Sequence, residues 1–115
     1  SDNSEGHDGI DVAASFGADI KSPSNGMVVF SGASIETGNT IILSHDFGFF
    51  TVYGHNDTNL VRERDIVVTG QVIAKVGDTG KSEGPHLHFE IWKNNRVLDP
   101  RDLIEEYKKK DVSIR

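Results

Sequence analysis

Two histidines and a glutamate alternate along one short segment, Pro85-His86-Leu87-His88-Phe89-Glu90. Successive side chains of a strand point to opposite faces, so a strand here would place His86, His88 and Glu90 together, with apolar side chains behind them. Imidazole and carboxylate groups are the ligands that zinc takes in many proteins. A solvated strand face would give the same pattern, so this segment alone does not establish a metal site.

A second pairing of histidine with carboxylate lies near the N-terminus, in His7-Asp8-Gly9-Ile10-Asp11. An extended chain would separate His7 from Asp11 by roughly 13 Å, whereas zinc ligands lie about 2 Å from the ion. The segment must therefore curl if both residues bind one ion, and Gly9 supplies the backbone freedom. The alternative is a surface turn that leads into a strand. Together with one histidine of the His86/His88 pair, His7 and Asp11 form a ligand set common at catalytic zinc.

His55 is a candidate acid–base group, because the pKa of histidine lies near neutrality. The alternative is a turn histidine, since His55 follows Tyr53-Gly54 at the end of an apolar run. Tyr53 would share the face of His55 if the strand continues, and it would either donate a hydrogen bond to a substrate or pack. Glu90 would either hold an imidazole by a hydrogen bond or remain solvated. His45 is assigned to the cap of a strand or turn.

The charge balance and the missing residue types exclude several function classes. The chain has 115 residues, with 12 basic and 18 acidic side chains and a formal net charge of −6. Sequence-independent nucleic-acid binding needs clustered Lys and Arg, so no nucleic-acid partner is expected. The chain contains no cysteine, which excludes disulfides and thiolate chemistry. No apolar stretch approaches the roughly 20 residues of a membrane-spanning helix, so no membrane segment is predicted.

Short apolar runs separated by Gly, Asn, Asp and Ser predict an all-β domain, a sandwich or a barrel. The expected strands are Met27–Phe30, Thr40–Leu43, Phe50–Tyr53, Ile66–Val68, Val72–Val76 and Leu87–Trp92. Asp99-Pro100 can open a helix, and the spacing that follows predicts a short C-terminal packing helix over about 100–110. The length favours one domain, residues 1–115. The chain begins at Ser1 without a signal peptide, so we expect a processed product or an excised piece.

Four motifs in this order resemble the lysostaphin-like (LytM-domain) zinc metallopeptidases, which cut the peptides of bacterial peptidoglycan. The motifs are His7-x-Gly9-x-Asp11, Thr51-x-Tyr53-x-His55, Gly77-x-Thr79-Gly80, and Gly84-Pro85-His86-Leu87-His88-Phe89-Glu90. They span nearly the whole chain, from His7 to Pro100. Each motif is only moderately specific alone, and their order and spacing make the resemblance specific.

The resemblance implies a zinc-dependent endopeptidase that hydrolyses peptidoglycan cross-links. His7, Asp11 and His88 would bind Zn²⁺, while His55 and His86 would flank the open coordination position. The implied fold is a compact antiparallel β-sandwich with a metal-bearing groove, its core covering residues 7–100. The implied location is the periplasm or cell envelope, inferred from the substrate. The sequence does not indicate an oligomeric state.

Departures from the family pattern concern the surroundings of the site. The family usually has a strand upstream of the first histidine, whereas only Ser1–Gly6 precede it here. Asn56 stands where a leucine is common, Glu83 where a small hydroxyl residue is frequent, and Arg64 at a turn position that is often glycine. None of these is a ligand or a catalytic histidine, so they bear on substrate choice.

Three other functions fit parts of the pattern. A LytM-type regulatory module that activates a partner cell-wall hydrolase would be expected to lack ligands, whereas every ligand position is filled here. A non-haem iron oxygenase also uses two histidines and one carboxylate. A sugar phosphotransfer carrier has a related sandwich and a histidine pair, but would not need Asp11. The zinc peptidase accounts for more of the motifs than any of these.

Overall fold

The computed structural model describes residues 9–80 and 84–98, which form an antiparallel all-β fold. Its strands are β1 (Ile10–Ala13), β2 (Asp19–Lys21), β3 (Gly26–Ser34), β4 (Gly38–Ser44), β5 (Phe49–Asn59), β6 (Ile66–Val67), β7 (Val72–Val76), β8 (His86–Lys93) and β9 (Arg96–Leu98), with one 3-10 turn, η1 (Asp46–Gly48), between β4 and β5. The all-β prediction is confirmed. The helix predicted over about 100–110 lies outside the described residues, as does His7.

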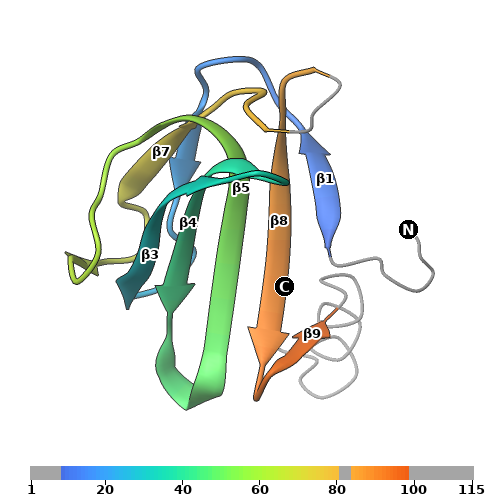
Figure 1. The fold of residues 1–115 in the computed structure, drawn as a ribbon. Coiled ribbons are helices and arrows are strands. Elements are labelled where there is room, and N and C mark those ends of the chain that lie inside the picture. The colour runs from blue at the N-terminus through green and yellow to red at the C-terminus, as the bar shows by residue number, and fades with distance from the viewer. Residues whose placement is uncertain (1–8, 81–83, 99–115) are drawn as a thin grey trace, which may run out of the picture.

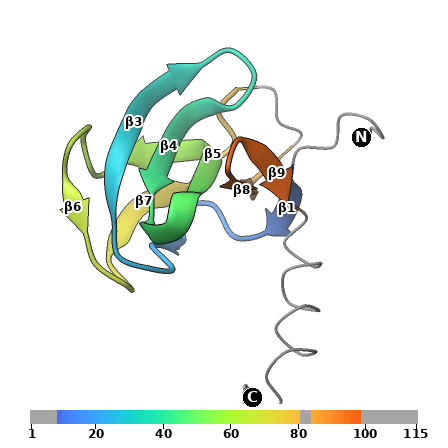
Figure 2. The same ribbon diagram turned by 90° about the horizontal axis from the view of Figure 1, so that it is seen from below.

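The strand order brings the two ends of the sequence together. The main sheet runs β1-β8-β5-β4-β3-β6. In Figure 1, β1, β8, β5, β4 and β3 lie side by side in that order. Short β6 lies at the far edge from β1 (Figure 2). β7 pairs with β2 and β5, while β9 pairs with β8 beyond the end of β1. The N-terminal strand thus lies against β8, as a site built from both chain ends requires.

Each of the six expected strand segments overlaps an observed strand, but the boundaries differ. β5 continues to Asn59, well past the expected end at Tyr53. Its extension reads Gly54-His55-Asn56-Asp57-Thr58-Asn59, a polar run with no apolar alternation. Pairing with β7 extends the strand there, because backbone hydrogen bonds form whatever the side chains are. Sequence periodicity therefore predicts where a strand is buried better than where it ends.

The hydrophobic core formed by these strands is almost wholly aliphatic. Its most deeply buried apolar side chains are Val28, Ile41, Leu43, Tyr53, Val67, Ile73, Ala74 and Val76, with Leu87 and Phe89 packed against them. Each large side chain stabilises the fold by about 1.5–3 kcal/mol on burial. Because Leu87 and Phe89 face this core, the alternate residues of β8 face the other way, where the candidate site lies.

β5 changes its partner halfway along its length, at His55. Its first half, Phe49 to Gly54, pairs with β8, and its second half, Asn56 to Asn59, pairs with β7. On the β4 side, pairing advances two residues from Asn39 to Ile41 while β5 advances three from Asn56 to Tyr53. The extra residue is a β-bulge, a feature that re-aims side chains next to active sites.

Candidate active site

Asp11 and His88 are direct cross-strand partners in the β1–β8 pair. Asp11 Oδ1 lies 3.1 Å from His88 Nδ1. The carboxylate is open to solvent, with 62% of the Asp11 side chain exposed, while the His88 ring is mostly covered. An exposed oxygen and a ring nitrogen thus face each other across two strands, in a position that an ion could reach.

Glu90 lies on the opposite side of the His88 ring. Its Oε2 lies 2.7 Å from His88 Nε2, so the imidazole stands between two carboxylates. The hydrogen bond with Glu90 raises the pKa of His88 above its ordinary value, and burial opposes this shift while Asp11 reinforces it. The site therefore favours positive charge on His88, whether a proton or a metal ion supplies it.

His55 reaches the site because the bulge reverses the side-chain alternation of β5. Its φ of 63° is left-handed, a conformation in which histidine is enriched among non-glycine residues. The His55 ring lies edge-on to two histidine rings of β8, with centroids 4.9 Å from His86 and 5.9 Å from His88. Three imidazoles therefore gather on the face opposite the core.

Two backbone carbonyls hold His55 in this position. The His55 backbone N–H donates to Thr37 O, and ring Nδ1 donates to Thr79 O across 2.6 Å. A carbonyl can only accept, so the proton of the neutral ring lies on Nδ1 and Nε2 carries the lone pair. Since His55 is only 6% exposed, its ring is both fixed and ready to accept a proton at Nε2.

The two turns that supply these carbonyls pack directly on each other. Gly38 and Gly80 both have positive φ, 63° and 77°, and a Cβ on either would collide with the backbone of the other turn. Thr79 Oγ1 accepts from Asn39 N at 3.0 Å and donates to Asn56 O at 2.7 Å. The geometry of His55 therefore depends on the contact between these two turns.

His86 contributes a third ring from the start of β8. Its Nδ1 lies 2.9 Å from Gly84 O, which places the proton of the neutral ring on Nδ1. Its Nε2 lies 3.5 Å from Asp11 Oδ1. His86 thus presents Nε2 toward Asp11, and its ring contacts that of His55, which has the same tautomer.

Tyr53 does not share the face of His55, because the bulge lies between them. It is 2% exposed in the core, its ring centroid 5.5 Å from that of Phe89. Its hydroxyl donates to Thr51 Oγ1 at 2.7 Å, and burial raises its pKa. Of the two alternatives that the sequence left for Tyr53, packing is the one that this geometry favours.

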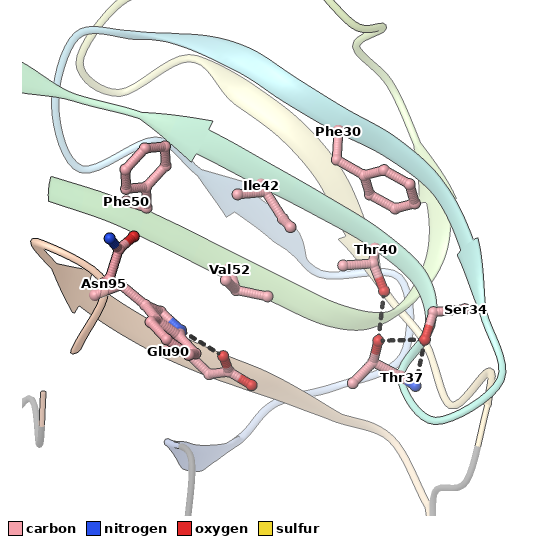
Figure 3. A pocket seen from close by; sticks show the side chains of 10 residues that line it. Phe30, Ser34, Thr37, Thr40, Ile42, Phe50, Val52, Glu90 and Asn95 are labelled. Carbon is pink, nitrogen blue, oxygen red and sulfur yellow. Dashed lines mark hydrogen bonds between the residues drawn. The ribbon is translucent and has the colours of Figure 1, made fainter. Parts of the chain in front are cut away.

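A groove of about 510 Å³ runs along the face of the sheet that carries Glu90 (Figure 3). Ile42 and Val52 form its floor, between the ring of Phe50 at one end and a hydroxyl cluster at the other. That cluster joins Thr37 to Ser34 and Thr40 by hydrogen bonds. Phe30, Trp92 and Asn95 complete the lining with Glu90, whose carboxylate also bonds to His88. Glu90 therefore connects the groove to the His88 ring.

The described donor atoms fit a divalent ion. Two ligands about 2 Å from a tetrahedral zinc are roughly 3.3 Å apart, close to the 3.1 Å between Asp11 and His88. The Glu90 carboxylate on the far nitrogen of His88 is a typical partner of a metal-binding histidine. No group of three or more ligating side chains forms a metal site within residues 9–80 and 84–98, and the expected third ligand, His7, lies outside them.

Several residues that shape the site carried no assigned role in the sequence. Thr37 and Thr79 hold His55 through their backbone carbonyls, which any residue would supply, although the Thr79 hydroxyl also bonds to Asn39 N and Asn56 O. Trp92 was detectable, because the alternation that links His86, His88 and Glu90 continues to it. Arg64 has a φ of 78°, which explains why glycine would suit this turn.

Known proteins share both sequence and fold with this chain. Residues 5–100 match Peptidase family M23. The murein hydrolase activator NlpD of Escherichia coli strain K12 is 43% identical over 96 residues, 83% of this chain and 25% of that protein. The peptidoglycan DD-endopeptidase ShyB of Vibrio cholerae is 39% identical over 93 residues, 81% of this chain and 22% of that protein. The chain thus spans about a quarter of the length of these curated relatives.

Solved structures give the same relationship. The catalytic domain of the antimicrobial peptidase lysostaphin from Staphylococcus simulans matches with a TM-score of 0.79 and 33% identity, over 86% of this chain and 79% of that one. A zinc-containing peptidase from Vibrio cholerae matches with a TM-score of 0.74 and 38% identity, over 76% of this chain and 27% of that one. The chain belongs to peptidase family M23.

Proposed function

We propose that this chain is a zinc-dependent endopeptidase that hydrolyses peptide cross-links of bacterial peptidoglycan. The observation that carries the proposal is the pairing of Asp11 with His88 beside two further histidines, His55 and His86. This arrangement supplies metal donors and proton-transfer groups within one small volume. Membership of a peptidase family supports it over the iron-oxygenase and phosphotransfer alternatives.

Asp11 and His88 would hold the zinc ion, with His7 as the third ligand. A bound zinc ion supplies Lewis acidity that polarises a peptide carbonyl and lowers the pKa of water to roughly 7. Glu90 would keep the His88 ring oriented by accepting from Nε2–H, which leaves Nδ1 on the side of Asp11. His88 is favoured over His86 as the ligand because it pairs directly with Asp11 across the strands.

His55 and His86 would move the protons. Peptide hydrolysis needs a base that takes a proton from water and an acid that gives one to the leaving amine. Each ring has its Nδ1 held by a backbone carbonyl, so each presents Nε2 for transfer. The fixed orientation reduces the reorganisation that the reaction requires. The same two groups could also stabilise the negative oxygen that develops on the carbonyl.

The relatives support peptidoglycan as the substrate. ShyB is named a peptidoglycan DD-endopeptidase, and the apolar groove beside Glu90 offers a surface on which a peptide could lie. A protein with this substrate acts in the periplasm or cell envelope, and a 43% identical relative from Yersinia enterocolitica is named a lipoprotein. No helix in the described part of the chain has the length and apolar character needed to cross a bilayer.

A second candidate function is a regulatory module that activates a partner cell-wall hydrolase. The specific observation in its favour is the 43% identity to NlpD, named a murein hydrolase activator. Such a role requires a binding surface but no proton transfer. The peptidase accounts for the paired Asp11 and His88 and for the two oriented histidines, which a module without catalysis does not need.

Digestion of purified peptidoglycan tests the peptidase. The zinc-loaded wild type and the His88→Ala variant are incubated with it, and released peptides are read by mass spectrometry. We expect cross-link peptides from the wild type only. His45→Ala is the matched control, because His45 bonds to Asn25 O and Thr51 Oγ1, apart from the site, and it should retain release. A wild type with one zinc per chain that releases nothing would contradict the peptidase and favour the activator.

A further inference from the structure

Trp92 is hydrogen-bonded to the same carboxylate that holds His88. Its indole Nε1–H donates to Glu90 Oε1 at 2.8 Å, while Glu90 Oε2 lies 2.7 Å from His88 Nε2. The three residues alternate along β8, so they share one face. Together they form a continuous chain of hydrogen bonds from the groove to Asp11.

Glu90 needs both of these partners to keep one orientation. Its side chain is only 13% exposed, and a covered carboxylate oxygen without a donor is costly. With Trp92 in place each oxygen has its own donor, and the rotation of the carboxylate is restricted. Without the indole N–H, the Glu90 carboxylate could rotate toward solvent, or both of its oxygens could accept from His88 Nε2–H in turn. The His88 ring would then lose a partner of fixed orientation.

Trp92 also forms part of the groove. It lines this cavity and stands directly opposite Phe50 in the β5–β8 pair. One side chain therefore contacts both the surface proposed for the substrate and the support of a proposed metal ligand. Since Glu90 pairs with Val52 of the groove floor, the whole support lies on ordered strands.

We propose that Trp92 is a positioning residue for the metal ligand His88, acting through Glu90. The inference rests on the proposed function, because it assigns His88 to the metal. Partners that orient metal-binding histidines typically contribute 10–100-fold to metal affinity. Trp92 acts one residue further out than Glu90, so its loss has the smaller effect.

The test measures zinc affinity in the metal-free 115-residue chain by competition with a chromophoric chelator. Trp92→Phe keeps a ring in the groove but removes the N–H, and we expect affinity to fall about 10-fold. Glu90→Ala should lose more, up to about 100-fold. Phe50→Leu is the matched control, because it removes an aromatic ring from the same groove and no hydrogen bond to Glu90. Its zinc affinity should stay within about twofold of the wild type.

The chain has one tryptophan, so its single indole N–H resonance in ¹H–¹⁵N NMR reports this contact directly. The resonance should lie downfield in the wild type, move upfield in Glu90→Ala, and shift when zinc is added to the wild type. The positioning role is overturned if Trp92→Phe binds zinc as tightly as Phe50→Leu. It is also overturned if the chemical shift of the indole N–H is the same in Glu90→Ala as in the wild type. In both cases the peptidase proposal stands. A wild type that binds no zinc overturns both.

Discussion

β8 and β5 bring histidines to the same place by opposite means. β8 delivers His86 and His88 through unbroken alternation, with His88 bonded to side chains of β1 and β8 and His86 to the Gly84 carbonyl just before the strand. β5 delivers His55 through a break in alternation, supported by carbonyls from two turns outside the strand. The β8 histidines follow the regular alternation of one strand, whereas the position of His55 depends on a bulge and on two turns outside its strand. Substitutions that affect His55 should therefore change peptide release, zinc content and stability differently from substitutions in β8.

The largest expected effect separates metal binding from proton transfer. His55→Ala should lower peptide release by at least about 100-fold, since a positioned acid–base group contributes 10²–10⁴-fold. Because His55 is proposed to bind no metal, its zinc content should remain near that of the wild type. The measurement combines mass spectrometry of digests with elemental analysis of the protein.

His88→Ala supplies the contrast, since it should lose both peptide release and zinc. Equal zinc loss in the two variants would mean that the β5 and β8 histidines do not have the separate roles proposed here.

The turn contact that holds His55 should be sensitive to a single methyl group. Gly80→Ala combines a left-handed φ of 77° with a collision against the backbone of Thr37 and Gly38. We expect a loss of about 3 kcal/mol in the free energy of unfolding, from backbone strain and overpacking together. Urea denaturation measures it.

Gly17→Ala is the matched control, because Gly17 has a φ of 85° but open space around it. It should lose only about 1–2 kcal/mol, the cost of the backbone conformation. If the two variants lost the same free energy of unfolding, the close contact between the turns would contribute nothing to stability beyond the backbone conformation of Gly80.

The Thr79 hydroxyl should have an intermediate effect on stability. Thr79→Val leaves Asn39 N–H and Asn56 C=O without their partner, which costs about 1–3 kcal/mol. Peptide release should fall less than in His55→Ala, because the carbonyl that holds the ring belongs to the backbone and remains. Thermal unfolding and digestion of peptidoglycan measure the two effects. Thr79→Ser keeps the hydroxyl and should stay close to the wild type in both measurements, and a Thr79→Ser protein as impaired as Thr79→Val would contradict the role of the hydroxyl.

The smallest effect concerns the ion pair behind β5. The hydrogen bond and charge of Lys75 lower the pKa of Asp19 below its ordinary value, and Lys75 pairs with Thr58 of β5. A lowered pKa stabilises the fold above the unfolded value of about 3.9, and this contribution is lost as pH falls through the folded value. The difference in the free energy of unfolding between the wild type and Asp19→Asn should be small and constant near neutral pH. This difference should decrease below about pH 4. Urea denaturation across pH checks it, and a gap that widens in acid would contradict the assignment.

The same contrast explains what the sequence could predict. Strict alternation from His86 to Glu90 predicted the site face of β8, and the approach of Asp11 to a histidine of this pair followed from zinc geometry. The metal-binding roles of His7, Asp11 and His88 stay predictions, and His7 lies outside the described residues. The bulge at His55 was not predictable, because the alternation of apolar and polar residues in the sequence does not indicate where a strand takes up an extra residue with positive φ. The expectation for Tyr53 assumed the alternation that this bulge breaks.

The support of His55 by Thr37 has a practical consequence for altering the protein. The β3–β4 turn is an exposed hairpin tip, with Ile35 85% exposed, and such tips ordinarily accept fused tags or inserted loops. Here an extra residue would shift the carbonyl that fixes the backbone of His55. The β4–β5 connection, where Phe47 is 84% exposed, offers an equally accessible attachment point at the opposite end of β4. Probes for imaging or immobilisation therefore belong at Phe47 and not at Ile35.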